Sequence, residues 1–272
     1  MSKIMPDSFN EYISGKKLYG DDFNEEQIFK WYKDEEEGYT NLGSNDKEKY
    51  TYQYVEMNKL YGFKYISKRR LFKNALGLGS AYGYEFLEII DQIENLTIIE
   101  PSEQLRSDKL GEIRPNYVKP NTLGNLNFND NTFDLIICLG VLHHIPNVSL
   151  VLQELHRVLA PDGILILREP IVSMGDWRAV RVGLTKNERG IPLGLFDQFI
   201  KTNNLKILSR KYCDSPFAYK TFQKLFCIKY NTLFIQLMDK LFSKLFSWNY
   251  RYHQSSIFEK LSPKSVYLVL KK

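Results

Sequence analysis

The sequence predicts an α/β fold in which a mostly parallel, seven-stranded sheet is flanked by helices. Short apolar runs alternate with stretches of helical periodicity along much of the 272 residues. The runs are continuously hydrophobic, which is typical of parallel strands that are buried on both faces. A glycine-rich loop follows the first run, at the edge where open sheets of this kind bind ligands.

The predicted strands follow one another with helical segments between them. They lie at residues 73–77, 96–100, 117–119, 133–138 and 164–167, and residues 206–212 and 266–270 add a two-stranded edge. Apolar residues spaced three to four apart predict helices that start near Asn24 and cover residues 47–60, 149–159 and 195–203. We therefore divide the chain into a helical cap (1–70), a core (71–216), a helical insertion (217–262) and a final strand (263–272).

A glycine turn and an acid mark a candidate nucleotide site. Gly77, Gly79 and Gly83 lie between the first strand and a helical segment. Glycines at such a place let backbone N–H groups approach a ligand that side chains would otherwise block. Glu100 ends the next strand, where a dinucleotide fold presents a carboxylate to ribose hydroxyls. The glycine spacing alone also fits a purely structural turn.

Residues 133–170 indicate which cofactor such a site would bind. They read FDLIICLGVLHHIPNVSLVLQELHRVLAPDGILILREP. This block resembles the class I S-adenosylmethionine-dependent methyltransferases, specifically the type 11-like group with FD-hydrophobic-LHH-P, then LxExxRVLxPGG, then an apolar strand. The resemblance covers residues 71–170. It implies a Rossmann-like sheet and S-adenosylmethionine as the cofactor.

The resemblance also implies roles for individual residues. The glycine turn would pass the methionine part of the cofactor, and Glu100 would accept hydrogen bonds from both ribose hydroxyls. The turns after the third and fourth strands add Asn121, Thr122 and Leu139 as cofactor contacts. Two acids that are usual in the family are replaced, one by Ala75 and one by Asn121 or Thr122, so the adenine contacts depart from the pattern.

His143 and His144 are the candidate general bases. They follow the fourth strand, next to the expected position of the methyl group, and an alcohol acceptor must lose its proton as its oxygen attacks. We favour His144, with Glu169 as the next candidate; both histidines could instead be loop-packing residues. A divalent metal held by His143, His144 and Glu169 is a variant that no tight ligand spacing supports.

The loop after the fifth strand, residues 170–194, is a candidate acceptor site. Trp177, Arg178 and Arg181 combine an aromatic face with guanidinium groups, which suits a sugar ring that carries an anionic group. A solvated charged loop is the competing interpretation. A loose resemblance to methyltransferases of bacterial surface-polysaccharide pathways also favours a sugar or nucleotide sugar as the acceptor.

The C-terminal insertion contains an amphipathic helix at residues 232–248. Leucines and phenylalanines repeat there every fourth residue and form one broad apolar stripe. The stripe would be buried against its own domain as a lid, against a second subunit in a homodimer, or against a membrane surface.

The hydropathy pattern and the N-terminal sequence predict a cytoplasmic protein, and the resemblance together with the 170–194 loop favours a small-molecule substrate. The formal net charge is +5, the N-terminus lacks a signal-peptide profile, and no run of apolar residues approaches membrane-spanning length. The absence of a long Lys/Arg track disfavours nucleic acid as a partner. The expected activity is methyl transfer to a hydroxyl of a small polar acceptor. The alternatives are a lipid or quinone precursor as acceptor, or a non-catalytic methyltransferase-like protein.

Overall fold

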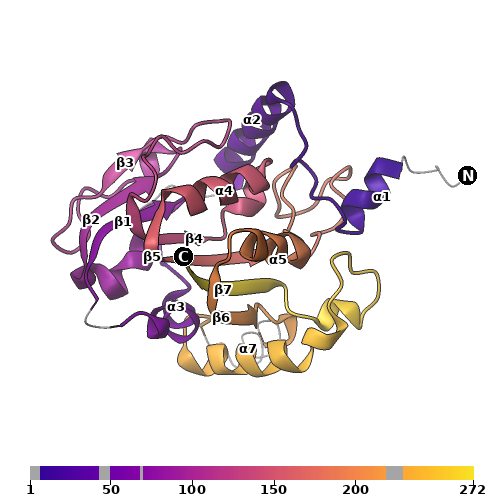
Figure 1. Ribbon diagram of the computed structural model, residues 1–272. Helices are drawn as coiled ribbons and strands as arrows, with labels where there is room; N and C mark the ends of the chain where they lie inside the picture. Colours follow the sequence, from indigo (N-terminus) through magenta and orange to yellow (C-terminus); the bar gives the residue numbers. More distant parts are fainter. Residues whose placement is uncertain (1–6, 43–49, 68–69, 219–228) are drawn as a thin grey trace, which may run out of the picture.

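The computed structural model has a seven-stranded sheet at its centre, with helices on both sides (Figure 1). It describes residues 7–42, 50–67, 70–218 and 229–272. The strand order is β3-β2-β1-β4-β5-β7-β6. All pairs are parallel except those that β7 makes with β5 and β6. This architecture is the Rossmann-like class I methyltransferase fold that the sequence predicts.

Every predicted strand is present. The strands are β1 (Phe72–Leu78), β2 (Ile93–Ile99), β3 (Asn116–Val118), β4 (Phe133–Leu139), β5 (Leu159–Pro170), β6 (Lys206–Cys213) and β7 (Ser265–Lys271). β5 begins earlier than predicted and includes the Pro-Asp-Gly segment. Since β1 to β5 run in parallel, their carboxyl ends share one edge of the sheet, where the predicted site residues follow them.

Two apolar cores hold helices against the two faces of the sheet. On one face, α4 (Val148–Val158) and α5 (Leu193–Thr202) pack on side chains such as Leu76 and Leu167. On the other face, α3 (Val55–Tyr61) and the 3₁₀ helix η2 (Tyr84–Gln92) pack on side chains such as Ala75 and Ile137. Continuous hydrophobic strands are required because both faces are covered.

The N-terminal segment confirms one predicted helix start and corrects a second. After α1 (Asp7–Ile13), α2 (Glu25–Leu42) starts with a reciprocal cap: Gln27 N donates to Asn24 Oδ1, and Asn24 N donates to Gln27 Oε1, both at 3.0 Å. The helix predicted at 47–60 is wrong at its start. Residues 50–54 are not helical and α3 begins at Val55, while residues 47–49 lie outside the described part.

Helix α7 (Leu233–Leu245) lies beside β6 and α3 but buries its polar side. Its buried residues include Gln236, Asp239 and Ser243, whereas Leu237 and Leu241 are exposed. Ile235 is buried and Phe242 contacts Phe217, but the domain leaves the leucines of the stripe uncovered in the described part of the chain. No helix in the described ranges is both long enough and apolar enough to span a bilayer.

Candidate functional site

Glu100 lies against the glycine turn. One carboxylate oxygen accepts a hydrogen bond from Ala81 N and the other from Ser102 N, each at 3.0 Å. The carboxylate is 5% exposed, and burial raises its pKa although these backbone N–H groups oppose the shift. An ionised carboxylate has about four lone-pair sites, so both oxygens keep capacity for a second donor. The geometry therefore fits a group with two neighbouring hydroxyls, such as a ribose.

The glycine turn also touches the loop that follows β4. Gly79 has φ +61°, and a Cβ at this position would lie 2.6 Å from Val141 Cγ1. Gly83 has φ +74°, and a Cβ there would meet Leu110 at 2.5 Å. Both positions therefore require glycine for conformation and for space.

Gly79→Ala should destabilise the protein by about 2–3 kcal/mol, from the left-handed backbone and the collision with Val141. Chemical denaturation measures this as a lower midpoint. The double variant Gly79→Ala/Val141→Ala should recover only the steric part of the loss. A midpoint equal to that of the wild type in the single variant would contradict the close contact.

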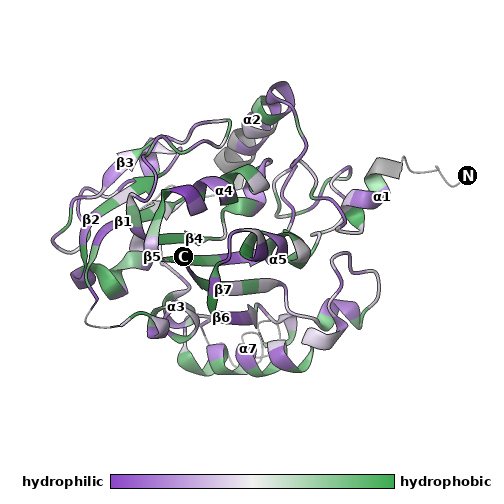
Figure 2. Ribbon diagram, viewed as in Figure 1, coloured by the Kyte–Doolittle hydropathy of each residue, from purple (hydrophilic) through white to green (hydrophobic). Residues whose placement is uncertain are grey.

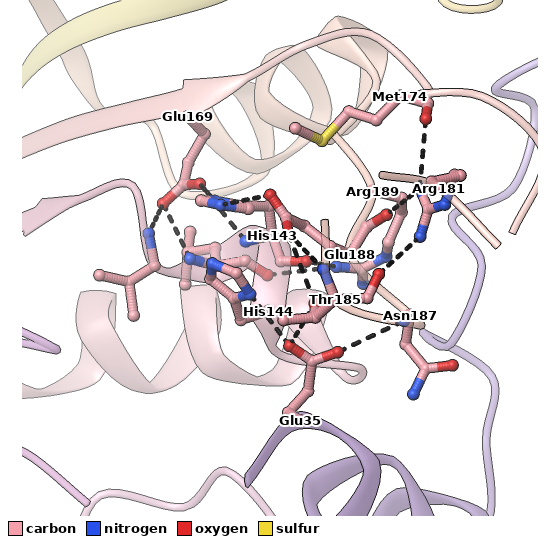
Figure 3. Close-up of polar contacts among 12 residues, drawn as sticks. Glu35, His143, His144, Glu169, Met174, Arg181, Thr185, Asn187, Glu188 and Arg189 are labelled. Carbon is pink, nitrogen blue, oxygen red and sulfur yellow. Dashed lines mark hydrogen bonds and ion pairs between the residues drawn. The ribbon is translucent and has the colours of Figure 1, made fainter. Parts of the chain in front are cut away.

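Glu169 fixes the β4 loop in place. One oxygen accepts hydrogen bonds from Val141 N and Leu142 N at 2.8 Å. The other accepts from His143 N at 3.3 Å and lies 2.8 Å from His143 Nδ1 (Figure 3). Burial alone would raise the Glu169 pKa, but these hydrogen bonds lower it, so the carboxylate is ionised. Because all four contacts go to the loop, the geometry gives Glu169 an orienting role.

His143 lies between two carboxylates. Since the Glu169 carboxylate accepts from Nδ1, the neutral ring carries its proton there and its lone pair on Nε2. Nε2 is 3.6 Å from Glu188 Oε1, which is too long for a hydrogen bond. Burial and the neighbouring His144 lower the His143 pKa, so the imidazole is neutral near pH 7. His143 therefore has the arrangement of an oriented base.

His144 belongs to a second carboxylate network. Its Nδ1 is 3.0 Å from Glu35 Oε2, and Thr185 Oγ1 donates to the same oxygen at 2.7 Å. Thr185 N donates to Glu188 Oε2 at 3.0 Å. Ring centroids of His143 and His144 are 4.0 Å apart. The cluster therefore joins α2, the β4 loop and the loop after β5, as Figure 3 shows.

Sequence reasoning missed Glu35 and Glu188. The first was part of a run of acids that reads as a solvated helix face, yet it is 4% exposed. The second lies in the acceptor loop and is 8% exposed. No local spacing connects these two positions with the histidines, since the contacts join residues more than 40 positions apart.

Arg168 is another site residue that the sequence did not reveal. Its side chain is 8% exposed, and its guanidinium carbon lies 3.5 Å from the centre of the Tyr54 ring. A Cβ on Gly140 would come 3.0 Å from Nη2. In the part of the chain that the structure describes, no carboxylate pairs with it. Nη1 lies 3.9 Å from Met57 Sδ. A buried guanidinium without a direct ion pair is a candidate to bind an anionic ligand at this edge of the sheet.

The acceptor-loop side chains contact the protein itself. Trp177 is buried, stacks on Tyr19 at 5.1 Å, and donates from Nε1 to Ser173 O. Arg181 donates to four carbonyl oxygens of its own loop, and Arg178 pairs with Asp176. These contacts give the three residues a role in holding the loop.

The remaining predicted cofactor contacts lie in the turns beyond β3 and β4. Asn121 Oδ1 accepts a hydrogen bond from Leu123 N, and Thr122 is exposed. Leu139 ends β4 and is half-buried. The structure thus brings the glycine turn, Glu100 and the β4 loop to one edge.

This fold, with an acid at the glycine turn, is that of the class I S-adenosylmethionine-dependent methyltransferases, and it implies S-adenosylmethionine as cofactor. Residues 76–167 match the family model described as "Methyltransferase domain".

Two curated relatives match part of the chain. A tRNA U34 carboxymethyltransferase of Nautilia profundicola is 29% identical over 161 residues, 55% of this chain and 54% of that protein. The mitochondrial arginine-hydroxylase NDUFAF5 of Danio rerio is 32% identical over 125 residues, 44% of this chain and 38% of that protein. The chain thus spans about half the length of the first and less of the second.

Two solved structures share the fold. A protein from Listeria monocytogenes assigned as an S-adenosylmethionine-dependent methyltransferase superposes with a TM-score of 0.53 at 13% identity, covering 80% of this chain and 98% of that one. The [4+2]-cyclase SpnF has a TM-score of 0.51 at 16% identity, covering 84% and 85%. The named activities of these four proteins differ, so the fold alone does not define the acceptor.

Proposed function

We propose that this protein transfers the methyl group of S-adenosylmethionine to a hydroxyl of a small polar acceptor. The observation that carries the proposal is the His143 imidazole, which Glu169 orients at the edge of the sheet that also carries Glu100. Bound S-adenosylmethionine supplies a methyl group activated by its positive sulfur. The protein must then position the acceptor oxygen and take up its proton.

The proposal gives a role to each group of residues at the carboxyl edge of the sheet. Glu100 accepts hydrogen bonds from the ribose hydroxyls, and the glycine turn leaves space for the methionine part. Arg168, which no carboxylate pairs with in the described ranges, binds the carboxylate of that methionine part. His143 Nε2 accepts the proton of the acceptor hydroxyl. His144, bound to Glu35, forms the adjoining wall of the site.

The charge of the cluster favours a neutral, hydroxyl-rich group beside the histidines, such as the sugar ring of a free or nucleotide-linked sugar. Glu35 and Glu188 provide carboxylate oxygens beside the histidines, and these accept hydrogen bonds from hydroxyl groups. The same carboxylates repel a phosphate backbone. The name of the Nautilia relative makes tRNA the second candidate acceptor, and the acidic cluster argues against it.

A transfer assay separates these functions. We expect radiolabelled S-adenosylmethionine to methylate a member of a sugar and nucleotide-sugar panel and to leave bulk tRNA unlabelled. If tRNA became labelled instead, tRNA rather than a sugar would be the methyl acceptor. Calorimetry that detects cofactor binding, without transfer to a sugar, quinone precursor or tRNA, would favour the non-catalytic alternative.

The cluster also allows a metal-assisted variant of the same reaction. Donor atoms of His143, His144 and Glu188 lie within 4.8 Å of one another, a mixed nitrogen and oxygen set that several divalent metals accept. Glu188 rather than Glu169 completes this set, because the Glu169 oxygens are bound to the loop. In this variant the ion would hold the acceptor hydroxyl.

Titration with Mn²⁺, followed by electron paramagnetic resonance, tests the metal variant. The metal variant predicts one bound Mn²⁺ ion per chain and a loss of Mn²⁺ binding in Glu188→Gln. Glu154→Gln, whose carboxylate pairs with Arg157 away from the cluster, is the matched control. Equal Mn²⁺ binding by both variants would show that Glu188 is not a metal ligand and would contradict the proposed ligand set.

A further inference from the structure

Helix α7 presents its apolar side to solvent. The four leucines of the helix are 42–56% exposed: Leu233, Leu237, Leu241 and Leu245. Trp248 directly follows the helix and is 75% exposed. Figure 2 shows that hydrophobic residues recur along this helix, which lies at the bottom of the view. A contiguous apolar stripe of this kind marks an interaction surface.

The contacts on the buried side of α7 explain why the four leucines face outward. Asp239 is 1% exposed and accepts hydrogen bonds from Ser215 N and Asp214 N. Gln236 is buried as well, and its side-chain amide donates to Tyr230 O. These polar contacts attach the helix to the loop after β6. The fold therefore does not use the leucine stripe to hold the helix.

The charges beside the stripe identify what it contacts. At about 100° per residue, Lys240 and Lys244 lie within about 60° of Leu237 around the helix axis. Both lysines are exposed, and the one acid of the helix, Asp239, is buried. Lys229 and Arg251, near the two ends of the helix, are exposed too. The outward face of α7 therefore carries apolar and basic side chains together: Lys240 lies at one edge of the leucine row, and Lys244 lies between Leu233 and Leu237 around the axis.

From this geometry we infer that α7 binds the protein to a membrane surface rich in anionic phospholipid. The leucines and Trp248 enter the boundary between headgroups and acyl chains, and the lysines pair with the phosphates. A second copy of the chain is less suitable, because a two-fold contact brings the two rows of lysines together without an exposed acid on the helix. The inference does not depend on the methyl acceptor.

Tryptophan fluorescence gives a direct test. The protein has three tryptophans; Trp31 and Trp177 are 2% and 6% exposed, so Trp248 alone reports on the outward face. Adding vesicles of phosphatidylcholine with phosphatidylglycerol should shift the emission to the blue and sediment the protein. Vesicles of phosphatidylcholine alone should do so at least tenfold more weakly. Equal binding to both, or no binding to either, would overturn the inference.

Substitutions place the contact on α7. Leu237→Glu/Leu241→Glu changes residues that are 42% and 54% exposed, so the fold should persist while vesicle binding falls by at least about 100-fold. Lys240→Ala/Lys244→Ala should weaken binding by about 25-fold. The matched control is Leu150→Glu on α4, 41% exposed, which should bind like the wild type. If Leu237→Glu/Leu241→Glu bound vesicles like the wild type, a membrane contact through α7 would be refuted. The inference would also fail if the wild type did not bind vesicles but formed a dimer that this variant abolished.

Discussion

Replacing Glu100 by alanine should weaken S-adenosylmethionine binding by on the order of 3 kcal/mol, roughly 150-fold in the dissociation constant. In the proposed complex, this variant would lose two charge-assisted hydrogen bonds to the ribose hydroxyls. Isothermal titration calorimetry measures the change. A dissociation constant equal to that of the wild type would remove Glu100 from the cofactor site.

The Glu100 result needs controls because this carboxylate also binds the backbone of the glycine turn. Glu100→Ala leaves Ala81 N and Ser102 N without their acceptor, so its unfolding free energy must be measured alongside. Glu100→Gln keeps an acceptor oxygen and should fold, yet it should still bind the cofactor more weakly. Glu94→Ala, at an exposed position on β2, the strand that Glu100 directly follows, should bind like the wild type.

Replacing His143 by asparagine should lower turnover by about 10²–10⁴-fold and leave cofactor binding unchanged. The asparagine amide can still donate to Glu169, so the β4 loop keeps its shape, while the basic Nε2 is lost. Steady-state kinetics with a saturating cofactor concentration measure the effect. Full turnover in this variant would exclude His143 as the base and leave His144, which His144→Asn would then test.

The pH dependence of turnover gives a second check on His143. Its pKa is lowered by burial and by His144, and the base acts only in its neutral form. Turnover should therefore persist as the pH falls through 6.5, the ordinary pKa of histidine, and decline only below it. A rate that already declines above pH 6.5 would show a group with an unshifted or raised pKa.

The fold followed from the sequence because its signal is local. Every predicted strand is present, since a parallel strand covered on both faces must be apolar throughout. The start of α2 was also recognisable, because Asn24 and Gln27 cap each other within four residues. The start of α3 was not: Tyr50 and Tyr54 have helical spacing, but they contact other aromatic rings as part of a non-helical segment.

The candidate site followed from the sequence only in part. The glycine turn and Glu100 belong to one strand-turn-strand unit, so their contact follows from a recognisable pattern. The partners of the histidines do not: Glu35 comes from α2 and Glu188 from the loop after β5. Such contacts depend on how loops pack, which spacing along the chain does not encode.

Helix α7 shows a second limit of pattern analysis. The periodicity correctly predicted an amphipathic helix, and the usual rule then places its apolar side against the core. Here Asp239 holds the polar side inward through the backbone of residues 214 and 215. Periodicity identifies the apolar stripe, but it does not show which side of the helix packs against the rest of the protein.

The central claim is that the loops at the carboxyl edge of the sheet meet around S-adenosylmethionine, with Glu100 at its ribose. A crystal structure of the protein with S-adenosylhomocysteine tests this most directly. We expect both ribose hydroxyls within hydrogen-bonding distance of Glu100, the methionine carboxylate at Arg168, and the sulfur facing His143. Density for the ligand at any other place, or an edge of the sheet closed by the protein's own side chains, would contradict the account.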